Sequence, residues 1–242
     1  MVRKEELTTV VFATRNVGKL RELERLVTFL PWRFESLEKH PGAPEVIEDG
    51  DTFLVNAALK AISAYRHTGR PALADDSGLC VDALGGEPGV FSSSFGGQEG
   101  NSARNNERLL AELAHVRCPE ERGAWFVSTL VLLGPESLFG EAALGARGSA
   151  SRRVLDIVPP DCALHVFEGR SRGTILFAPR GSGGFGYDPL FASREVQTHR
   201  ALADRPTFAE LPLEEKNAVS HRGRAFAAFA AFCQRLRSVG LG

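Results

Sequence analysis

The sequence predicts an α/β fold, because short apolar segments typical of strands alternate with longer segments whose apolar residues recur at helical spacing. The 242 residues are enough for a substantial core, in one large domain or in two lobes. The apolar fraction of 43% and the charged fraction of 24% are those of an ordinary globular protein. No internal repeat or low-complexity tract interrupts the chain, so we expect a single domain over residues 1–242.

Three apolar runs are the expected strands. Residues 10–13 (VVFA) are rich in strand formers and precede a polar loop. Residues 71–74 (PALA) form a second buried run, which Asp75 and Asp76 follow at the expected end of the strand. Residues 125–133 are the third and longest run. Their apolar character indicates strands buried in a sheet.

Four segments are the expected helices. Over residues 20–30 the leucines and Val27 recur at helical spacing, and Pro31 ends the pattern. Residues 51–65 and 101–113 each carry one apolar face. Residues 223–239 form the last helix, with three core phenylalanines expected on one side: Phe226, Phe229 and Phe232. The intervening segment 134–169, rich in Gly, Ser, Arg and Pro, is expected to be an extended hairpin or a mobile insert.

Composition excludes several classes of protein. A formal net charge of −1 does not favour a general nucleic-acid or membrane surface. The charged start MVRKEELTT lacks the apolar core of a signal peptide, and no stretch approaches the length of a membrane span. The four cysteines are scattered without a C-x-x-C pair, so neither a zinc site nor a disulfide framework is expected. We therefore expect a cytoplasmic protein.

The loop from Thr14 to Lys19 joins the first strand to the first helix. Backbone N–H groups and the positive dipole end of the helix point towards this loop, an arrangement that favours an anion such as phosphate. The loop has one glycine and matches neither the G-x-x-x-x-G-K-[ST] phosphate loop nor a dinucleotide fingerprint. An ordinary strand-to-helix turn with a solvated lysine is the alternative.

Two acidic stretches stand out, and the second of them indicates a cation site. In VIEDGDTF, Glu48 precedes a helix, although Asp51 could instead simply cap that helix. In ADDSG, two adjacent carboxylates at the end of a buried strand are costly unless a cation or donors face them. Mg²⁺ is suited to one or two such carboxylates together with phosphate oxygens. A solvated pair of aspartates in a turn is the alternative.

Two later stretches have compositions that packing does not explain. RGSGGFGYDPLF combines glycines with Phe185 and Tyr187, so its backbone and rings could approach and stack on a nucleobase. A glycine-rich hairpin with core aromatics is the alternative. EEKNAVSHRGRAF places Lys216, His221 and Arg222 just before the last helix, where a solvated face is the alternative interpretation.

The order of these motifs resembles one known family. T-x-N-x-x-K, E-D-G-D-T-F, A-D-D-S-G-L, G-G-F-G-Y-D-P-L-F and E-E-K-N-x-x-S-H-R-G are similar to the inosine triphosphate pyrophosphatase family from Val10 to Phe232. The resemblance implies an elongated, mixed-sheet α/β domain with two lobes and an active cleft between them. It also implies hydrolysis of deaminated purine triphosphates (ITP, dITP, XTP) to the monophosphate and pyrophosphate, in a homodimer.

The resemblance also implies roles for individual residues. Glu48 and Asp76 would hold Mg²⁺, and Asp76 would act as the base. The residues expected to contact the phosphates are Thr14, Arg15, Asn16, Val17, Gly18 and Lys19. Ser77 would touch the substrate, and the residues expected to frame the base are Phe185, Gly186, Tyr187, Asp188, Lys216, His221 and Arg222. His221 or Arg222 would donate to the six-oxygen of hypoxanthine or xanthine, where adenine carries an amino group.

The chain departs from the family in three places. Arg15 stands where many relatives have glycine, Ser94 stands where arginine is common, and the 134–169 segment is longer than usual. The longer segment bears on any inherited dimer interface. Two other functions compete with the favoured one: hydrolysis of pyrimidine or modified nucleotides by the same fold, and nucleotide sensing without catalysis.

Overall fold

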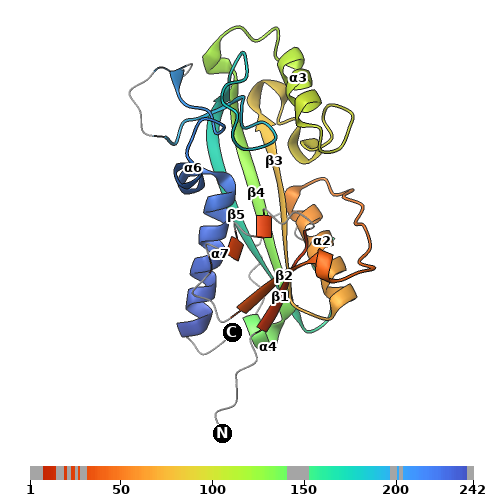
Figure 1. Cartoon of the computed structure of the whole chain (residues 1–242). Coiled ribbons are helices and arrows are strands. Elements are labelled where there is room, and N and C mark those ends of the chain that lie inside the picture. Colours follow the sequence, from red (N-terminus) through yellow and green to blue (C-terminus); the bar gives the residue numbers. More distant parts are fainter. Residues whose placement is uncertain are drawn as a thin grey trace. The chain divides into compact units, whose positions relative to one another are not determined.

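The computed structural model describes residues 8–14, 19–20, 23–24, 27, 32–140, 153–196, 201 and 204–238. In this part of the chain, six strands form one sheet in the order β2-β1-β3-β4-β5-β6 (Figure 1). The strands are β1 Thr8–Phe12, β2 Trp32–Ser36, β3 Ala72–Val81, β4 Gly123–Pro135, β5 Cys162–Ile175 and β6 Phe191–Ser193. Strand β1 pairs in parallel with β2 and β3, whereas β5 and β6 are antiparallel. The expected mixed α/β sheet is therefore confirmed.

Helices follow the predicted pattern with small shifts at their ends. The α-helices are α2 Phe53–Thr68, α3 Ser102–Glu112, α4 Glu136–Phe139, α6 Leu213–Val219 and α7 His221–Ser238. Short 3-10 turns are η1 Leu37–Lys39, η2 Asp82–Leu84, η3 Gly89–Phe91 and η4 Pro119–Glu121. The helix expected over 20–30 falls largely outside the described residues. No helix in the described part of the chain combines the length and the apolar character that crossing a bilayer requires.

The chain divides into two compact units. Unit 1 consists of Met1–Asp76, Thr129–Phe167 and Phe226–Gly242, and unit 2 of Ser77–Ser128 and Glu168–Ala225. In unit 1, alanines of α2 pack against β3 and β4 in one core cluster. The phenylalanines of α7 lie against the N-terminal strands, with ring centroids 6.5 Å apart for Phe12–Phe226 and 6.2 Å for Trp32–Phe229. Phe226 and Phe229 are fully buried and Phe232 is half-buried, as the sequence predicts for core residues.

Unit 2 has its own aromatic core. Phe126 on β4 stacks on Phe208 with ring centroids 5.9 Å apart, and Phe191 packs against both rings. Leucines of α3 complete this cluster. Because each unit buries its own apolar side chains, each has a closely packed core that holds its polar side chains in place.

Two element boundaries differ from the sequence prediction. Asp75 and Asp76 do not follow the end of their strand, because β3 continues to Val81 and buries both aspartates. The final helix begins at His221 rather than at Gly223, since Ser220 accepts a hydrogen bond from the Gly223 N–H at 3.1 Å and acts as its cap. His221 and Arg222 therefore lie in the first turn of α7, not before it.

The 134–169 segment contains several elements. It begins with the end of β4 and helix α4, and its last residues from Cys162 belong to β5. Residues 141–152 lie outside the described part of the chain. The insert expected here therefore remains a prediction, confined to the part of the segment before β5. Of the four cysteines, Cys80, Cys162 and Cys233 are buried and Cys118 is exposed, and all four are free thiols.

Candidate active site

Helix α2 and the loop before it carry the first group of charged side chains in unit 1. Thr52, not the alternative Asp51, caps the helix, because its hydroxyl accepts from the Val55 N–H at 3.3 Å. The buried Asn56 side chain accepts from the Gly50 N–H at 2.8 Å and so fixes the loop to the helix. The helix thus positions the loop that carries Glu48.

Lys60 on α2 bridges the two carboxylates expected to bind metal. Its Nζ lies 2.9 Å from Glu48 Oε2 and 2.8 Å from Asp76 Oδ1. Burial lowers the pKa of Lys60, but the two carboxylates outweigh this effect and raise it above its ordinary value. Lys60 is therefore a fixed positive charge between Glu48 and Asp76.

Asp76 is the buried carboxylate of this group. Its Oδ1 contacts Lys60, while its buried Oδ2 has no hydrogen-bond partner among the residues that the structure describes. Burial raises the pKa of Asp76 to about 7, against the opposing effect of Lys60. A buried carboxylate oxygen without a donor is stabilised by a cation or by a water that donates to it.

Asp75 and Lys19 form a second pair in the same unit. Lys19 Nζ lies 3.0 Å from Asp75 Oδ2, and only 2% of the Asp75 side chain is exposed. The alternative of a freely solvated lysine is therefore wrong, as is that of solvated aspartates. The predictions for Arg15, Asn16, Val17 and Gly18 concern residues outside the described part of the chain.

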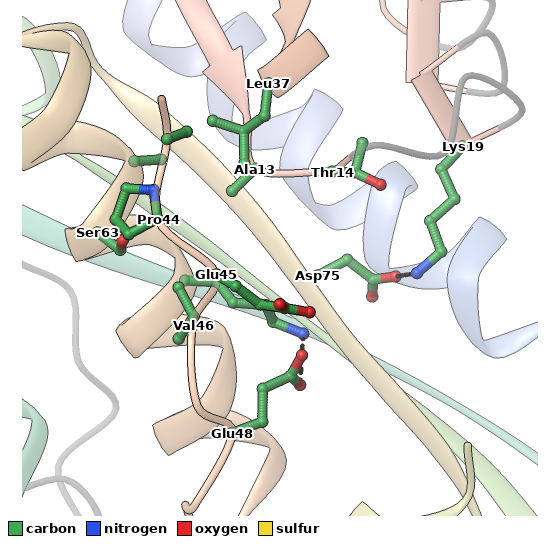
Figure 2. Close-up of a pocket in the computed structure, with 13 residues that line it drawn as sticks. Ala13, Thr14, Lys19, Leu37, Pro44, Glu45, Val46, Glu48, Ser63 and Asp75 are labelled. Carbon is green, nitrogen blue, oxygen red and sulfur yellow. Dashed lines mark hydrogen bonds and ion pairs between the residues drawn. The ribbon is translucent and has the colours of Figure 1, made fainter. Parts of the chain in front are cut away.

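A cavity of about 270 Å³ opens beside these pairs, as Figure 2 shows for the side chains at its wall. Its lining residues come from the first strand, the loop before α2, α2 itself and β3: Ala13, Thr14, Lys19, Leu37, Ala43, Pro44, Glu45, Val46, Glu48, Lys60, Ser63, Ala64 and Asp75. Lysine ammonium groups beside an open cavity can bind anionic oxygens. Thr14 and Lys19, the described ends of the expected phosphate loop, thus share one cavity with the expected metal ligand Glu48.

The residues present suit Mg²⁺. Glu48 and Asp76 offer carboxylate oxygens joined through one lysine, and Asp76 Oδ2 has spare acceptor capacity. The described residues contain no group of three or more His, Cys, Asp or Glu side chains arranged for a metal. Two carboxylates without a complete protein cage match the way Mg²⁺ is held together with substrate phosphates.

Phe185 is the centre of a second group, in unit 2. Its ring is 57% exposed, and cations of Lys216 and Arg222 lie 4.9 and 5.0 Å from the ring centroid. Asp188 is buried and accepts from Lys216 Nζ at 2.6 Å and from the Phe185 N–H at 2.8 Å. Gly184 has a φ of +73°, and a Cβ there would lie 2.1 Å from Asp188 Oδ2, so glycine is required. The structure therefore presents an exposed aromatic ring beside two cations.

The other residues predicted to frame the base have different surroundings. His221 is buried and stacks on Phe126 with ring centroids 4.6 Å apart. Arg222 Nη2 lies 3.5 Å from Ser77 Oγ, and its side chain is also buried, so the solvated-face alternative is wrong for both. Tyr187 is a core residue: its hydroxyl donates to the Ser92 carbonyl at 2.8 Å, and burial raises its pKa. The alternative of core aromatics thus holds for Tyr187 but not for Phe185.

Sequence reasoning missed Lys60 and the pairing of Asp75. The polar face of the helix over 51–65 contains Lys60, but helical spacing alone does not indicate what a lysine contacts. A usable signal was present: two aspartates in an apolar strand need positive partners, and the preceding helix offers one. The particular partners depend on tertiary structure.

Solved structures place this architecture within a known class of α/β proteins. A HAM1 protein from Coxiella burnetii superposes with a TM-score of 0.74 at 32% identity, covering 94% of this chain and 99% of that one. The nucleoside-triphosphatase / dITP/XTP pyrophosphatase of Mycobacterium abscessus gives a TM-score of 0.68 at 40% identity, covering 92% and 98%.

Residues 10–232 match the Ham1 family, and the chain belongs to this family. It is 47% identical over 221 residues to the dITP/XTP pyrophosphatase of Geobacter sulfurreducens, covering 91% of this chain and 94% of that protein. The span of the match equals the span over which the sequence motifs resemble the inosine triphosphate pyrophosphatases.

Proposed function

We propose that this chain is a nucleoside-triphosphate pyrophosphatase that hydrolyses deaminated purine triphosphates (ITP, dITP and XTP) to the monophosphate and pyrophosphate. The observation that carries the proposal is the buried Asp76 carboxylate, tied through Lys60 to Glu48 beside a cavity with lysines. Membership of the Ham1 family and the similarity to dITP/XTP pyrophosphatases support it. The reaction is NTP + H₂O → NMP + pyrophosphate.

The unit 1 residues are assigned to the phosphates and the water. Lys19 and Lys60 supply positive charge to the triphosphate, where charge develops on the leaving pyrophosphate. Asp76 holds the attacking water through its Oδ2 and takes its proton, a role suited to a carboxylate whose pKa is raised towards neutrality. Mg²⁺, held by Glu48 and Asp76, would polarise phosphate oxygens and increase the acidity of bound water.

The unit 2 residues are assigned to the base. The exposed Phe185 ring offers a stacking surface, which by itself does not distinguish one purine from another. Arg222 and His221 are proposed to donate to the six-oxygen of hypoxanthine and xanthine. Adenine has an amino group at that position and would leave such donors without an acceptor, at a cost of about 1–3 kcal/mol each. Guanine shares the six-oxygen, so GTP must be discriminated elsewhere.

A substrate panel tests this function. The wild-type chain, with Mg²⁺, is expected to release pyrophosphate from ITP, dITP and XTP with kcat/KM at least about tenfold above that for ATP. Release of orthophosphate instead of pyrophosphate would contradict the assigned bond cleavage. Preference for dUTP or another pyrimidine triphosphate would favour the rival hydrolase, and binding without turnover would favour a nucleotide sensor.

The assembly and location of the protein are further parts of the proposal. A homodimer is proposed from the family resemblance, and light scattering after gel filtration measures its mass. A cytoplasmic location is supported by four cysteines that carry no disulfide bond. Neither nucleic acid nor a membrane is proposed as a partner. Titration with EDTA and back-addition of Mg²⁺ test the metal requirement.

A further inference from the structure

Helix α3 forms two hydrogen bonds with the backbone of the loop that carries Phe185. The Gly186 N–H donates to Ser102 Oγ at 3.2 Å, and Asn106 Nδ2 donates to the Gly186 carbonyl at 3.0 Å. Ser102 and Asn106 are four residues apart, so they share one face of α3. Both backbone polar groups of one residue, Gly186, are therefore held by one helix.

The helix itself does not need these two side chains. Asn101 caps α3, because its side chain accepts from the Arg104 N–H at 3.1 Å. Asn105 fixes the preceding loop through bonds to the Gly96 N–H and the Ser93 carbonyl. Ser102 and Asn106 instead reach out to Gly186, which lies 84 and 80 residues further along the chain.

The glycines on either side of the exposed ring cannot anchor the loop through side chains. Gly184 and Gly186 have positive φ angles of +73° and +60°, and glycine has no side chain that could anchor the loop. Phe185 itself is 57% exposed, so packing does not fix its ring. Its backbone is held on one side by Asp188 and on the other by the two α3 residues. The orientation of the ring thus depends on these backbone hydrogen bonds together with the cations of Lys216 and Arg222 over its face.

We propose that Ser102 and Asn106 are positioning residues for base recognition: they hold the Gly186 peptide so that the Phe185 ring is presented to the purine. The inference rests on the proposed function, which supplies the purine. Holding the ring in advance removes part of the ordering cost of binding. Both residues contact the loop assigned to the base and not the groups assigned to the chemical step, so their loss should weaken substrate binding rather than slow that step.

Three variants and one control test this positioning. Ser102→Ala and Asn106→Ala each remove one hydrogen bond, and each is expected to raise KM for ITP about two- to tenfold with kcat retained. Ser102→Thr keeps the hydroxyl and should restore the wild-type KM. Glu107→Ala changes an exposed neighbour on α3 and should leave KM unaltered. Amide hydrogen exchange of residues 184–187 should speed up in the two alanine variants only.

The outcomes separate the positioning from the proposed function. Unchanged exchange, an unchanged KM, a fall in kcat alone or failure of Ser102→Thr to restore KM would each overturn the positioning. Calorimetric binding of inosine monophosphate gives a readout that does not need turnover. If the wild type binds it but hydrolyses no ITP, the proposed function is wrong, and weaker binding by Ser102→Ala still supports the positioning. If the wild type does not bind it, the positioning is overturned.

Discussion

The charged group of unit 1 and the aromatic group of unit 2 both pair a buried aspartate with a lysine, but they differ in what surrounds the pair. In unit 1, Glu48 and Asp76 meet Lys60, and Asp75 meets Lys19, so each buried aspartate has a lysine within 3.0 Å. In unit 2, the cations of Lys216 and Arg222 lie beside an exposed ring. The group in unit 1 fixes the positions of charged side chains, whereas the group in unit 2 fixes the position of an exposed aromatic ring.

The supports of the two groups differ accordingly. Lys60, Asp75 and Asp76 stand on α2 and β3, whose backbones are fixed by regular hydrogen bonding and a packed core. Phe185 stands on a glycine-containing loop fixed by hydrogen bonds to Asp188 in the same loop and to Ser102 on α3. Substitutions in unit 1 should therefore act through electrostatics and turnover, and those in unit 2 through binding and selectivity.

Asp76→Asn should have the largest effect, because it removes the proposed base while keeping the shape of the side chain. Turnover of ITP at saturating Mg²⁺ is expected to fall about 10²–10⁴-fold. The fold should survive, since burial disfavours the charge of Asp76 and Lys60 keeps Glu48 as a partner. Single-turnover hydrolysis and thermal unfolding measure both effects, with the exposed Asp51→Asn as control.

Retention of more than about a tenth of the turnover by a normally folded Asp76→Asn would show that Asp76 is not the base. Asp75 and Glu48 would then be the candidates. The contrast between the units would still stand, because both candidates belong to unit 1.

Lys19→Ala should rank second. A charge-assisted contact to phosphate contributes on the order of 1.5–3 kcal/mol, so kcat/KM for ITP is expected to fall roughly 10–150-fold. Lys19→Arg keeps the cation and the partner of Asp75, and should lose much less. Steady-state kinetics with the exposed Lys39→Ala as control decide the matter. Equal kinetics for Lys19→Ala and the wild type would show that the loop from Thr14 to Lys19 is an ordinary strand-to-helix turn.

Arg222→Ala tests whether unit 2 selects the base. It should narrow the gap between ITP and ATP by lowering kcat/KM for ITP about 5- to 100-fold, since a donor to the six-oxygen is lost. Arg235→Ala, an exposed residue on the same helix, is the control. An equal loss on both nucleotides would assign Arg222 to phosphate binding or to structure.

Substitution of His165 should have the smallest effect, which is on the pH dependence of stability. His165 is a buried titratable group of unit 1 that lies outside the charged group, so it sharpens the comparison. Its ring packs against Phe139 and Phe232, and burial lowers its pKa. The unfolded chain therefore takes up this proton at a higher pH than the folded chain, so stability is lost as pH falls below about 6.5. Thermal unfolding from pH 7.5 to 5 should show a shallower decline for His165→Phe, by a few degrees at most. An unchanged pH dependence would show that another group causes the loss of stability at low pH.

The sequence alone predicted the architecture because its signals are local. Apolar spacing indicated α2, α3 and α7, and apolar runs indicated β1, β3 and β4. Except for the end of β3, each prediction lies within a few residues of the observed ends. The glycines around Phe185 predicted a backbone with unusual freedom to approach a ligand, and Gly184 has a φ of +73°. Motif order gave the family, which the match over residues 10–232 confirms.

Tertiary structure decided how charges are paired and which side chains are buried. The sequence suggested that β3 ends before Asp75, because two buried carboxylates in a strand are costly on their own. Lysines 56 and 16 residues away offset part of that cost, and local patterns carry no information about contacts at such separations. Tyr187 and Phe185, two residues apart, likewise looked equivalent in sequence. Only the packed core of unit 2, which buries Tyr187 against Ser92 and leaves the Phe185 ring exposed, distinguishes them.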